Sequence, residues 1–250
     1  MITVLIPTIS SERIQTLFQA VISIQAGKYR DTHVVIISDG NLHIYKEAKK
    51  TLRNVSVILN KERMGWPATI NKMVKELNSE CFAYASDDLI FPSDCLHCAL
   101  HTMRRRFPDG DGVVTLGKKN RCAFGLFGSK FADRFPDRQI FCPDYFHYGG
   151  DSELYRTLMS LNRFAYPPKR DSQVQHSRLK DGSWIMARKK RTKDLAMYKL
   201  RAEKGFSWGI DFNLITREKT SSENDSKRRS LEGEGSSERI SYDSRHEGFE

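Results

Sequence analysis

The chain has 250 residues, of which 39% are hydrophobic and 29% charged, and its formal net charge is +10. This composition suits one large α/β domain, and no stretch reaches the roughly 20 apolar residues that a membrane-spanning helix needs. The opening residues, Met1 to Pro7, lack the basic region of a signal peptide, so we expect a cytoplasmic protein. The five cysteines show no disulfide framework, which agrees with a reducing compartment.

The excess of positive charge lies before residue 217, because residues 217–250 hold seven Lys or Arg against nine Asp or Glu. A basic body favours an anionic ligand, and charge alone leaves open nucleotide phosphates, nucleic acid or an anionic surface. From residue 217 onward, the apolar residues give way to Ser, Glu, Gly and Arg. Such a segment cannot bury enough surface to offset its ordering entropy, so we expect a disordered tail over 217–250.

Short apolar runs alternate with amphipathic stretches through the first half of the chain. The runs predict strands at residues 2–6, 33–38, 55–59 and 81–85, and helical spacing predicts helices at 14–22, 43–53, 70–77 and after Pro92. This alternation with short loops predicts a mainly parallel central sheet, in which ligands bind beyond the carboxyl ends of the strands. We therefore expect Pro7-Thr8, Asp39-Gly40 and Asp87-Asp88 at one ligand-binding edge.

The second half of the chain is less regular. Its pattern predicts strands at residues 112–117 and 121–127, ordered loops over 128–150, and helices at 151–161 and 192–204. We expect both halves, residues 1–110 and 111–216, to form a single α/β domain.

The strongest local signal is Ser86-Asp87-Asp88, where two adjacent carboxylates follow a buried strand at the expected ligand edge. Oxygen ligands of this kind suit Mg²⁺ or Mn²⁺, either of which would also bridge a diphosphate. The alternative is structural, because one Asp could cap the helix near Pro92 or form an Asx turn.

Four motifs, taken in order, resemble those of the GT-A glycosyltransferases, and among them the family-2-like inverting enzymes. The motifs are Val4-Leu-Ile-Pro-Thr8, Ile37-Ser-Asp-Gly40, Asn60-Lys-Glu-Arg-Met-Gly65 with Asn71, and Ala85-Ser-Asp-Asp88 with Pro92. The resemblance covers residues 1–100 well and 101–205 loosely. It implies a single GT-A-like, Rossmann-like domain with a nucleotide-sugar-binding half at 1–110 and an acceptor and catalytic half at 111–216.

The resemblance also implies roles for individual residues. The nucleotide-sugar would lie against Pro7, Thr8, Asp39, Arg63, Asn71 and Asp88. A Mn²⁺ or Mg²⁺ ion would be held by Asp87, with Asp88 beside it and His176 as a late ligand. The family's first motif Asp falls on Ala85 here, which removes a carboxylate that normally helps to hold the sugar or ribose.

The segment His147-Tyr-Gly-Gly-Asp151-Ser-Glu153 is similar to the segment that supplies the catalytic base in this family. A base must be a carboxylate that takes the proton of the acceptor hydroxyl, and we expect Asp151 in this role, with Glu153 as second choice. The alternative is that Asp151 or Ser152 only caps a helix. Basic residues at 188–191, read as a late flexible loop, could stabilise the leaving diphosphate or form a solvated face.

The expected function is metal-dependent, inverting transfer of a sugar from a nucleoside diphosphate sugar, foremost a UDP-sugar, to an unknown hydroxyl acceptor. One alternative is a nucleotidyltransferase of related fold, which would need a Gly-rich loop that Pro7 to Glu12 lacks. A second is a non-enzymatic nucleic-acid-binding protein, for which the charge is present without a recognition motif. A third is a transferase that binds its donor without turnover, because of Ala85.

Overall fold

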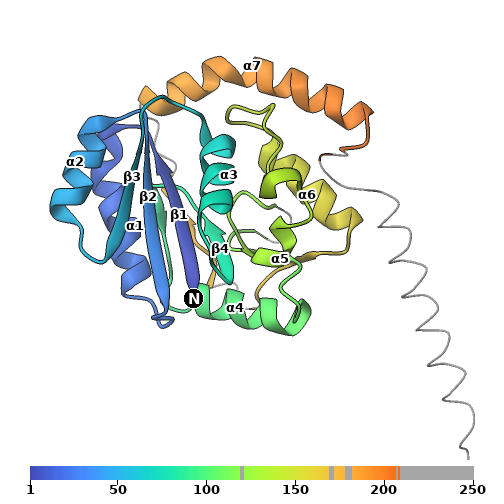
Figure 1. Cartoon of the computed structure of the whole chain (residues 1–250), viewed down its shortest axis with the longest axis horizontal. Coiled ribbons are helices and arrows are strands. Elements are labelled where there is room, and N and C mark those ends of the chain that lie inside the picture. The colour runs from blue at the N-terminus through green and yellow to red at the C-terminus, as the bar shows by residue number, and fades with distance from the viewer. Residues whose placement is uncertain (119–120, 169–171, 178–181, 207, 209–250) are drawn as a thin grey trace, which may run out of the picture. The chain divides into compact units, whose positions relative to one another are not determined.

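The computed structural model describes residues 1–118, 121–168, 172–177, 182–206 and 208 (Figure 1). One compact unit spans Met1–Ile210, so the described parts of both predicted halves lie in the same body. The predicted tail, residues 217–250, lies outside the described residues.

The strands of the described residues are β1 (Ile2–Thr8), β2 (Thr32–Asp39), β3 (Val55–Asn60), β4 (Cys81–Tyr84), β5 (Leu89–Ile90), β6 (Val113–Thr115), β7 (Gly125–Gly128), β8 (Phe164–Ala165) and β9 (Gln175–His176). The α-helices are α1 (Ile14–Gln25), α2 (Leu42–Thr51), α3 (Trp66–Glu76), α4 (Cys95–Arg106), α5 (Ser129–Ala132), α6 (Gly150–Ser160) and α7 (Gly182–Glu203). Two short 3₁₀ turns are η1 (Ser11–Arg13) and η2 (Pro136–Arg138).

The main sheet has the strand order β3-β2-β1-β4-β7-β6-β8 in the part of the chain that is described. Strands β1 to β4 run parallel to one another, as the alternating pattern predicted. Only β7 runs antiparallel to its neighbours β4 and β6, while β8 is parallel to β6. The fold is therefore α/β with a mainly parallel central sheet, which confirms the predicted fold class.

The two faces of the sheet are buried by different partners. Alternate residues of β1, namely Ile2, Val4 and Ile6, enter an aliphatic core with the apolar sides of α1, α2 and α4. Helix α3 packs against the other face, where the aromatic rings of Trp66, Phe82, Tyr84, Phe127 and Phe141 contact one another. Figure 1 shows α1 and α2 on one side of the sheet and α3 on the other.

Two predictions about the second half need correction. The late helix begins at Gly182 rather than near residue 192, so the basic residues 188–191 lie within α7 and not in a flexible loop. Ala, Met, Arg and Lys in this stretch are good helix formers, which explains the earlier start. The strand predicted at 121–127 is shorter and later, because only Gly125–Gly128 pairs with β4 and β6.

No helix among the described residues is long and apolar enough to cross a membrane. Helix α7, the longest at 22 residues, has seven Lys or Arg and therefore a polar surface.

Candidate functional site

Strand register brings the predicted ligand-binding loops together at one edge of the sheet. Thr8, the last residue of β1, is opposite Ser38 of β2, and Asp39 is opposite Asn60 of β3. Strand β4 lies on the other side of β1 and leads directly into Asp87. The Thr8 hydroxyl donates a 2.7 Å hydrogen bond to Asp87 Oδ2, so the convergence predicted from the pattern is present.

The two motif carboxylates are buried and bonded to the protein. Asp87 Oδ1 lies 3.0 Å from Arg13 Nη1, and the same nitrogen lies 3.5 Å from Asp88 Oδ2. The Ser86 hydroxyl donates to Asp88 Oδ1 at 2.7 Å. Neither Asp caps helix α4, whose N-cap residue is Asp94. The prediction that one of these aspartates caps the helix is therefore wrong, while the Asx turn stays a prediction.

The neighbouring aspartates differ in their pKa values. Burial raises the pKa of Asp87 above its ordinary value, and Arg13 and the Thr8 hydrogen bond oppose this effect without cancelling it. Burial also acts on Asp88, but hydrogen bonds from His176 and Ser86, together with nearby positive charge, leave its pKa lowered. Asp88 is thus the more firmly ionised of the two.

His176 reaches the site on strand β9, which pairs antiparallel with β5 and sets His176 opposite Leu89. Its Nε2 lies 3.1 Å from Asp88 Oδ2, and the backbone N–H of Ser177 donates to the Asp88 carbonyl at 3.1 Å. The histidine, predicted from the resemblance as a late ligand, does therefore stand beside the aspartate pair.

The predicted metal ligands do not fit a metal ion as they are arranged. All four carboxylate oxygens of Asp87 and Asp88 accept from protein donors, namely Thr8, Arg13, Ser86 and His176. Throughout the described part of the chain, no group of three or more His, Cys, Asp or Glu side chains is placed to hold a metal. The expected Asp87–Asp88–His176 metal centre is thus replaced by a network that includes Arg13.

Asp39 organises the loop between β3 and α3. Its carboxylate accepts from the Asn60 side chain at 3.0 Å and from the backbone N–H groups of Met64 and Gly65 at 2.9 Å each. Gly65 has φ +90, and a Cβ there would lie 2.5 Å from the Phe146 carbonyl oxygen. The motif glycine therefore permits a close approach between this loop and the segment before α6.

Asn71 also has a structural role that the sequence did not reveal. Its side-chain nitrogen donates to the Phe141 carbonyl at 2.7 Å, and its side-chain oxygen accepts from the Phe141 N–H at 3.0 Å. Asn71 is buried and fully engaged by that backbone, so we no longer assign it to the nucleotide. Arg63 remains on the same loop as Gly65, with its guanidinium 5.3 Å from the centroid of the Phe146 ring.

Asp151 lies in the first turn of α6, directly after Gly149 and Gly150. Burial raises its pKa, while its bonds to Ser152 and the charge of Arg121 lower it by less. The pKa of the buried Cys122 thiol is raised to about 12, first by burial and further by the charge of Asp151. The charge of Asp151 also acts on the Tyr84 hydroxyl, which donates to the Cys122 carbonyl at 2.7 Å, so Asp151 lies near the side chain of the last residue of β4.

Glu153, the second-choice base, is held by other side chains. Arg201 donates to both of its carboxylate oxygens at 2.7 Å, and the Tyr145 hydroxyl donates at 2.8 Å. Both carboxylate oxygens of Glu153 are thus already hydrogen-bonded within the protein. We therefore assign Glu153 to the attachment of α7 and keep Asp151 as the candidate base.

Two residues of this region were missed by the sequence interpretation. Arg13 follows β1 in a short polar loop, and nothing in its spacing indicated a bond to the aspartates 74 residues later. Asp194 lies on α7 and accepts from the backbone N–H groups of Phe146, His147 and Tyr148 at 2.8–3.0 Å. Helix α7 thus holds the loop that leads into Asp151.

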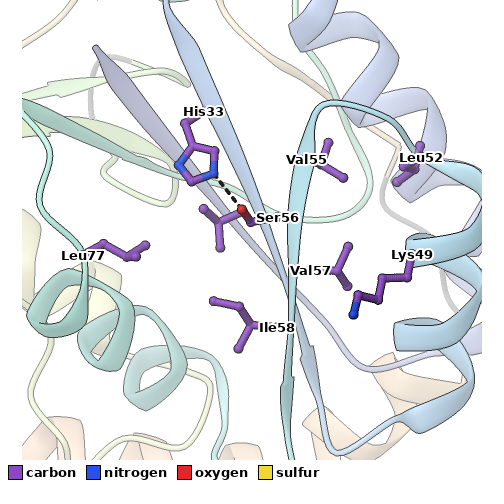
Figure 2. A pocket seen from close by; sticks show the side chains of 9 residues that line it. His33, Lys49, Leu52, Val55, Ser56, Val57, Ile58 and Leu77 are labelled. Carbon is purple, nitrogen blue, oxygen red and sulfur yellow. Dashed lines mark hydrogen bonds between the residues drawn. The ribbon is translucent and has the colours of Figure 1, made fainter.

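A shallow pocket of about 410 Å³ lies elsewhere, at the β3 edge of the sheet. Figure 2 shows His33, bonded to Ser56, near apolar side chains of β3 and near Leu52 and Leu77, which directly follow α2 and α3. None of the Asp87 network lines this pocket, so we do not assign the donor to it.

The fold of this chain is similar to that of solved glycosyltransferases. Residues 3–115 match the family model described as Glycosyl transferase family 2, which confirms the predicted resemblance over that range. No curated protein matches the chain in sequence.

Solved glycosyltransferase structures share the fold at low sequence identity. The mannosyltransferase PcManGT from Pyrobaculum calidifontis, in complex with GDP-Man and Mn²⁺, is 18% identical with a TM-score of 0.56, over 81% of this chain and 64% of that chain. S. aureus TarS 1-349 in complex with UDP is 16% identical with a TM-score of 0.51, over 67% and 58%. S. aureus TarS is 15% identical with a TM-score of 0.50, over 67% and 35%. The chain thus spans less than two thirds of each of these proteins.

Proposed function

We propose that the chain transfers a sugar from a nucleoside diphosphate sugar to a hydroxyl acceptor, with inversion at the anomeric carbon. The observation that carries this proposal is Asp151, a half-buried carboxylate with a raised pKa, which lies in the first turn of α6 and whose charge acts on the side chain of Tyr84, the last residue of β4. A single base of this kind suits direct displacement, because no second carboxylate is needed to form a covalent intermediate.

In the proposed reaction, the acceptor oxygen attacks the anomeric carbon as the bond from that carbon to the diphosphate oxygen breaks. Asp151 takes the proton of the acceptor hydroxyl, and the nucleoside diphosphate leaves with the bonding electrons. Arg63 is the cation that we assign to the developing charge on the diphosphate, since the charge of Arg13 is already opposed by Asp87 and Asp88. Arg63 lies close enough to His147 to lower its pKa, after the larger effects of burial and of Asp194.

The donor is expected among UDP-sugars and GDP-mannose, because these nucleotides occupy similar folds in TarS and PcManGT. The resemblance also implied Mn²⁺ or Mg²⁺. The proposed reaction needs no metal ion, since the carboxylates that would hold one are bonded to Arg13 and to the hydroxyls of Thr8 and Ser86.

The test of the base is Asp151→Asn. We expect turnover to fall by about 10²–10⁴-fold, the range typical of a lost general base, while donor binding remains. Asp133→Asn is the matched control, because this exposed carboxylate forms an ion pair with Arg138 at 3.0 Å and is not among the site residues. Wild-type turnover in Asp151→Asn would refute the assignment.

The pH profile supplies a second readout. Asp151 acts only when deprotonated, and burial raises its pKa, so kcat should fall on the acid side at a higher pH than for an ordinary Asp. Asp151→Asn should lose this acid limb along with most of the rate. A limb that persists unchanged in the variant would belong to another group.

Two competing functions give different results in the same assays. Release of pyrophosphate from a nucleoside triphosphate and a sugar phosphate would support a nucleotidyltransferase. Salt-sensitive binding to generic DNA, without any effect of nucleotide-sugars, would support a nucleic-acid-binding protein.

A further inference from the structure

The cation at the aspartate pair is part of the chain itself. Arg13 Nη1 lies between Asp87 Oδ1 at 3.0 Å and Asp88 Oδ2 at 3.5 Å. The Arg13 side chain is only 13% exposed, and the two carboxylates are 4% and 2% exposed. A guanidinium placed in this way supplies one positive charge to two buried negative charges, which would otherwise repel each other.

The backbone fixes Arg13 in this position. Its N–H donates to the Ser10 carbonyl at 3.0 Å within η1, and the Thr16 hydroxyl donates to the Arg13 carbonyl at 2.9 Å. Arg13 is also the N-cap residue of α1, and the apolar side of this helix is buried in the core. The arginine therefore extends from a rigid turn directly after β1 and not from a mobile loop.

The carboxylate oxygens of Asp87 and Asp88 also accept hydrogen bonds from two hydroxyls and from a histidine. Thr8 holds Asp87 Oδ2 at 2.7 Å, Ser86 holds Asp88 Oδ1 at 2.7 Å, and His176 holds Asp88 Oδ2 at 3.1 Å. A divalent ion bound to both aspartates would have to displace Arg13, because the like charges would otherwise lie within a few ångströms. Ala85 also leaves this motif with two carboxylates where the related pattern has three.

We propose that Arg13 takes the place of a divalent cation at Asp87 and Asp88, so that the diphosphate of the donor is held without a metal ion. The role of Arg13 at Asp87 and Asp88 can be tested without any donor. The binding of a donor diphosphate without a metal ion rests on the proposed function.

The first experiment measures binding of Mn²⁺ alone, by electron paramagnetic resonance and by thermal shift. Wild type should show no site for Mn²⁺, whereas Arg13→Met, which removes the charge and keeps the side-chain length, should bind Mn²⁺ at least about tenfold more tightly. The double variant Arg13→Met, Asp87→Asn should lose that binding. Arg105→Met is the control, since Arg105 is an exposed residue in the last turn of α4 and is not among the site residues.

The second experiment measures UDP and GDP binding in EDTA and in Mn²⁺. Wild type should bind one of them equally in both solutions, and Arg13→Met should bind only when Mn²⁺ is present. Arg13→Lys keeps a positive charge and Arg13→Gln removes it, so Arg13→Lys should bind nucleotide in EDTA more tightly than Arg13→Gln, which preserves the test if Arg13→Met does not fold.

The outcomes separate this inference from the proposed function. Tight Mn²⁺ binding by the wild type, or nucleotide binding that requires Mn²⁺, would overturn the inference. Equal absence of Mn²⁺ binding in wild type and folded Arg13→Met would also overturn it, because the pair would then be no cation site. If neither nucleotide binds under any condition, the proposed function fails, while the Mn²⁺ comparison still decides the role of Arg13.

Discussion

In the first half of the chain, the site residues stand where parallel strands end, whereas in the second half they are held by side chains from distant segments. Thr8, Asp39 and Asp87 follow or end β1, β2 and β4, and their neighbours are set by strand register. The loop before Asp151 has no such ladder. It is fixed by Asp194, which accepts three backbone N–H groups, and by the close approach at Gly65.

This difference predicts how strongly a substitution in each half affects stability and the site. The many backbone hydrogen bonds of the sheet hold a residue at the end of a parallel strand in place. The loss of one side-chain hydrogen bond therefore moves that residue little. A loop held by a few charged side chains depends on each of them. Substitutions in the second half should therefore cost more stability and disturb the site more.

The largest effect is expected at Arg201, which forms two hydrogen bonds to the buried Glu153. Arg201→Met leaves that carboxylate unpaired, and loss of one partner of a buried pair costs about 3–5 kcal/mol. Urea denaturation measures the change. The double variant Arg201→Met, Glu153→Leu should recover most of the loss, because a buried pair can be replaced by apolar groups. A double variant no more stable than Arg201→Met would show that the pair is not the cause.

The next largest effect is expected at Asp194. Asp194→Ala leaves three backbone N–H groups without their acceptor, at a cost of about 3 kcal/mol. Turnover should fall more than donor binding, because the loop of residues 146–148 leads into Asp151. The control is Glu203→Gln, an exposed carboxylate on the same helix. Equal losses of donor binding and turnover would argue against a specific effect on the loop.

A smaller effect is expected at Gly65, at the contact between the two halves. Gly65→Ala combines a positive φ with a Cβ only 2.5 Å from the Phe146 carbonyl oxygen, and we expect a loss of about 2 kcal/mol. Gly110→Ala is a matched control, because its φ is also positive, at +74, but an added Cβ there meets nothing within 4 Å. The excess loss in Gly65→Ala over Gly110→Ala measures the collision, and equal losses would exclude it.

The same difference explains what could be predicted from the sequence. The periods of the apolar residues predicted the parallel strands, and parallel strands bring their carboxyl ends together by geometry alone. The neighbourhood of Thr8, Asp39 and Asp87 could therefore be predicted from the positions of the strands. The position of Asp151 at the start of a helix also agrees with the helix predicted at 151–161.

The side-chain bonds across long sequence separations could not be predicted. Arg13 bonds Asp87 across 74 positions, Asn71 bonds Phe141 across 70, and Arg201 bonds Glu153 across 48. A single sequence shows only that such residues are polar, and a polar residue on a helix or loop is most often solvated. Asn71 and Glu153 consequently received site roles from the resemblance, while their side chains are engaged in packing the fold.

The smallest effect is expected at Thr8, and it tests the first half directly. Thr8→Val removes the hydroxyl that donates to Asp87 at 2.7 Å but keeps the β-branched shape that suits β1, so we expect a stability loss of about 1 kcal/mol. Thr3→Val is the matched control, because the Thr3 hydroxyl donates to Ser79 at 2.9 Å on the same strand, away from the site. Both variants should lose similar stability by urea denaturation, and only Thr8→Val should weaken nucleotide binding, since only Asp87 belongs to the site. A loss at Thr8 as large as that at Arg201 would mean that the aspartate network, rather than the strand register, holds this edge of the sheet.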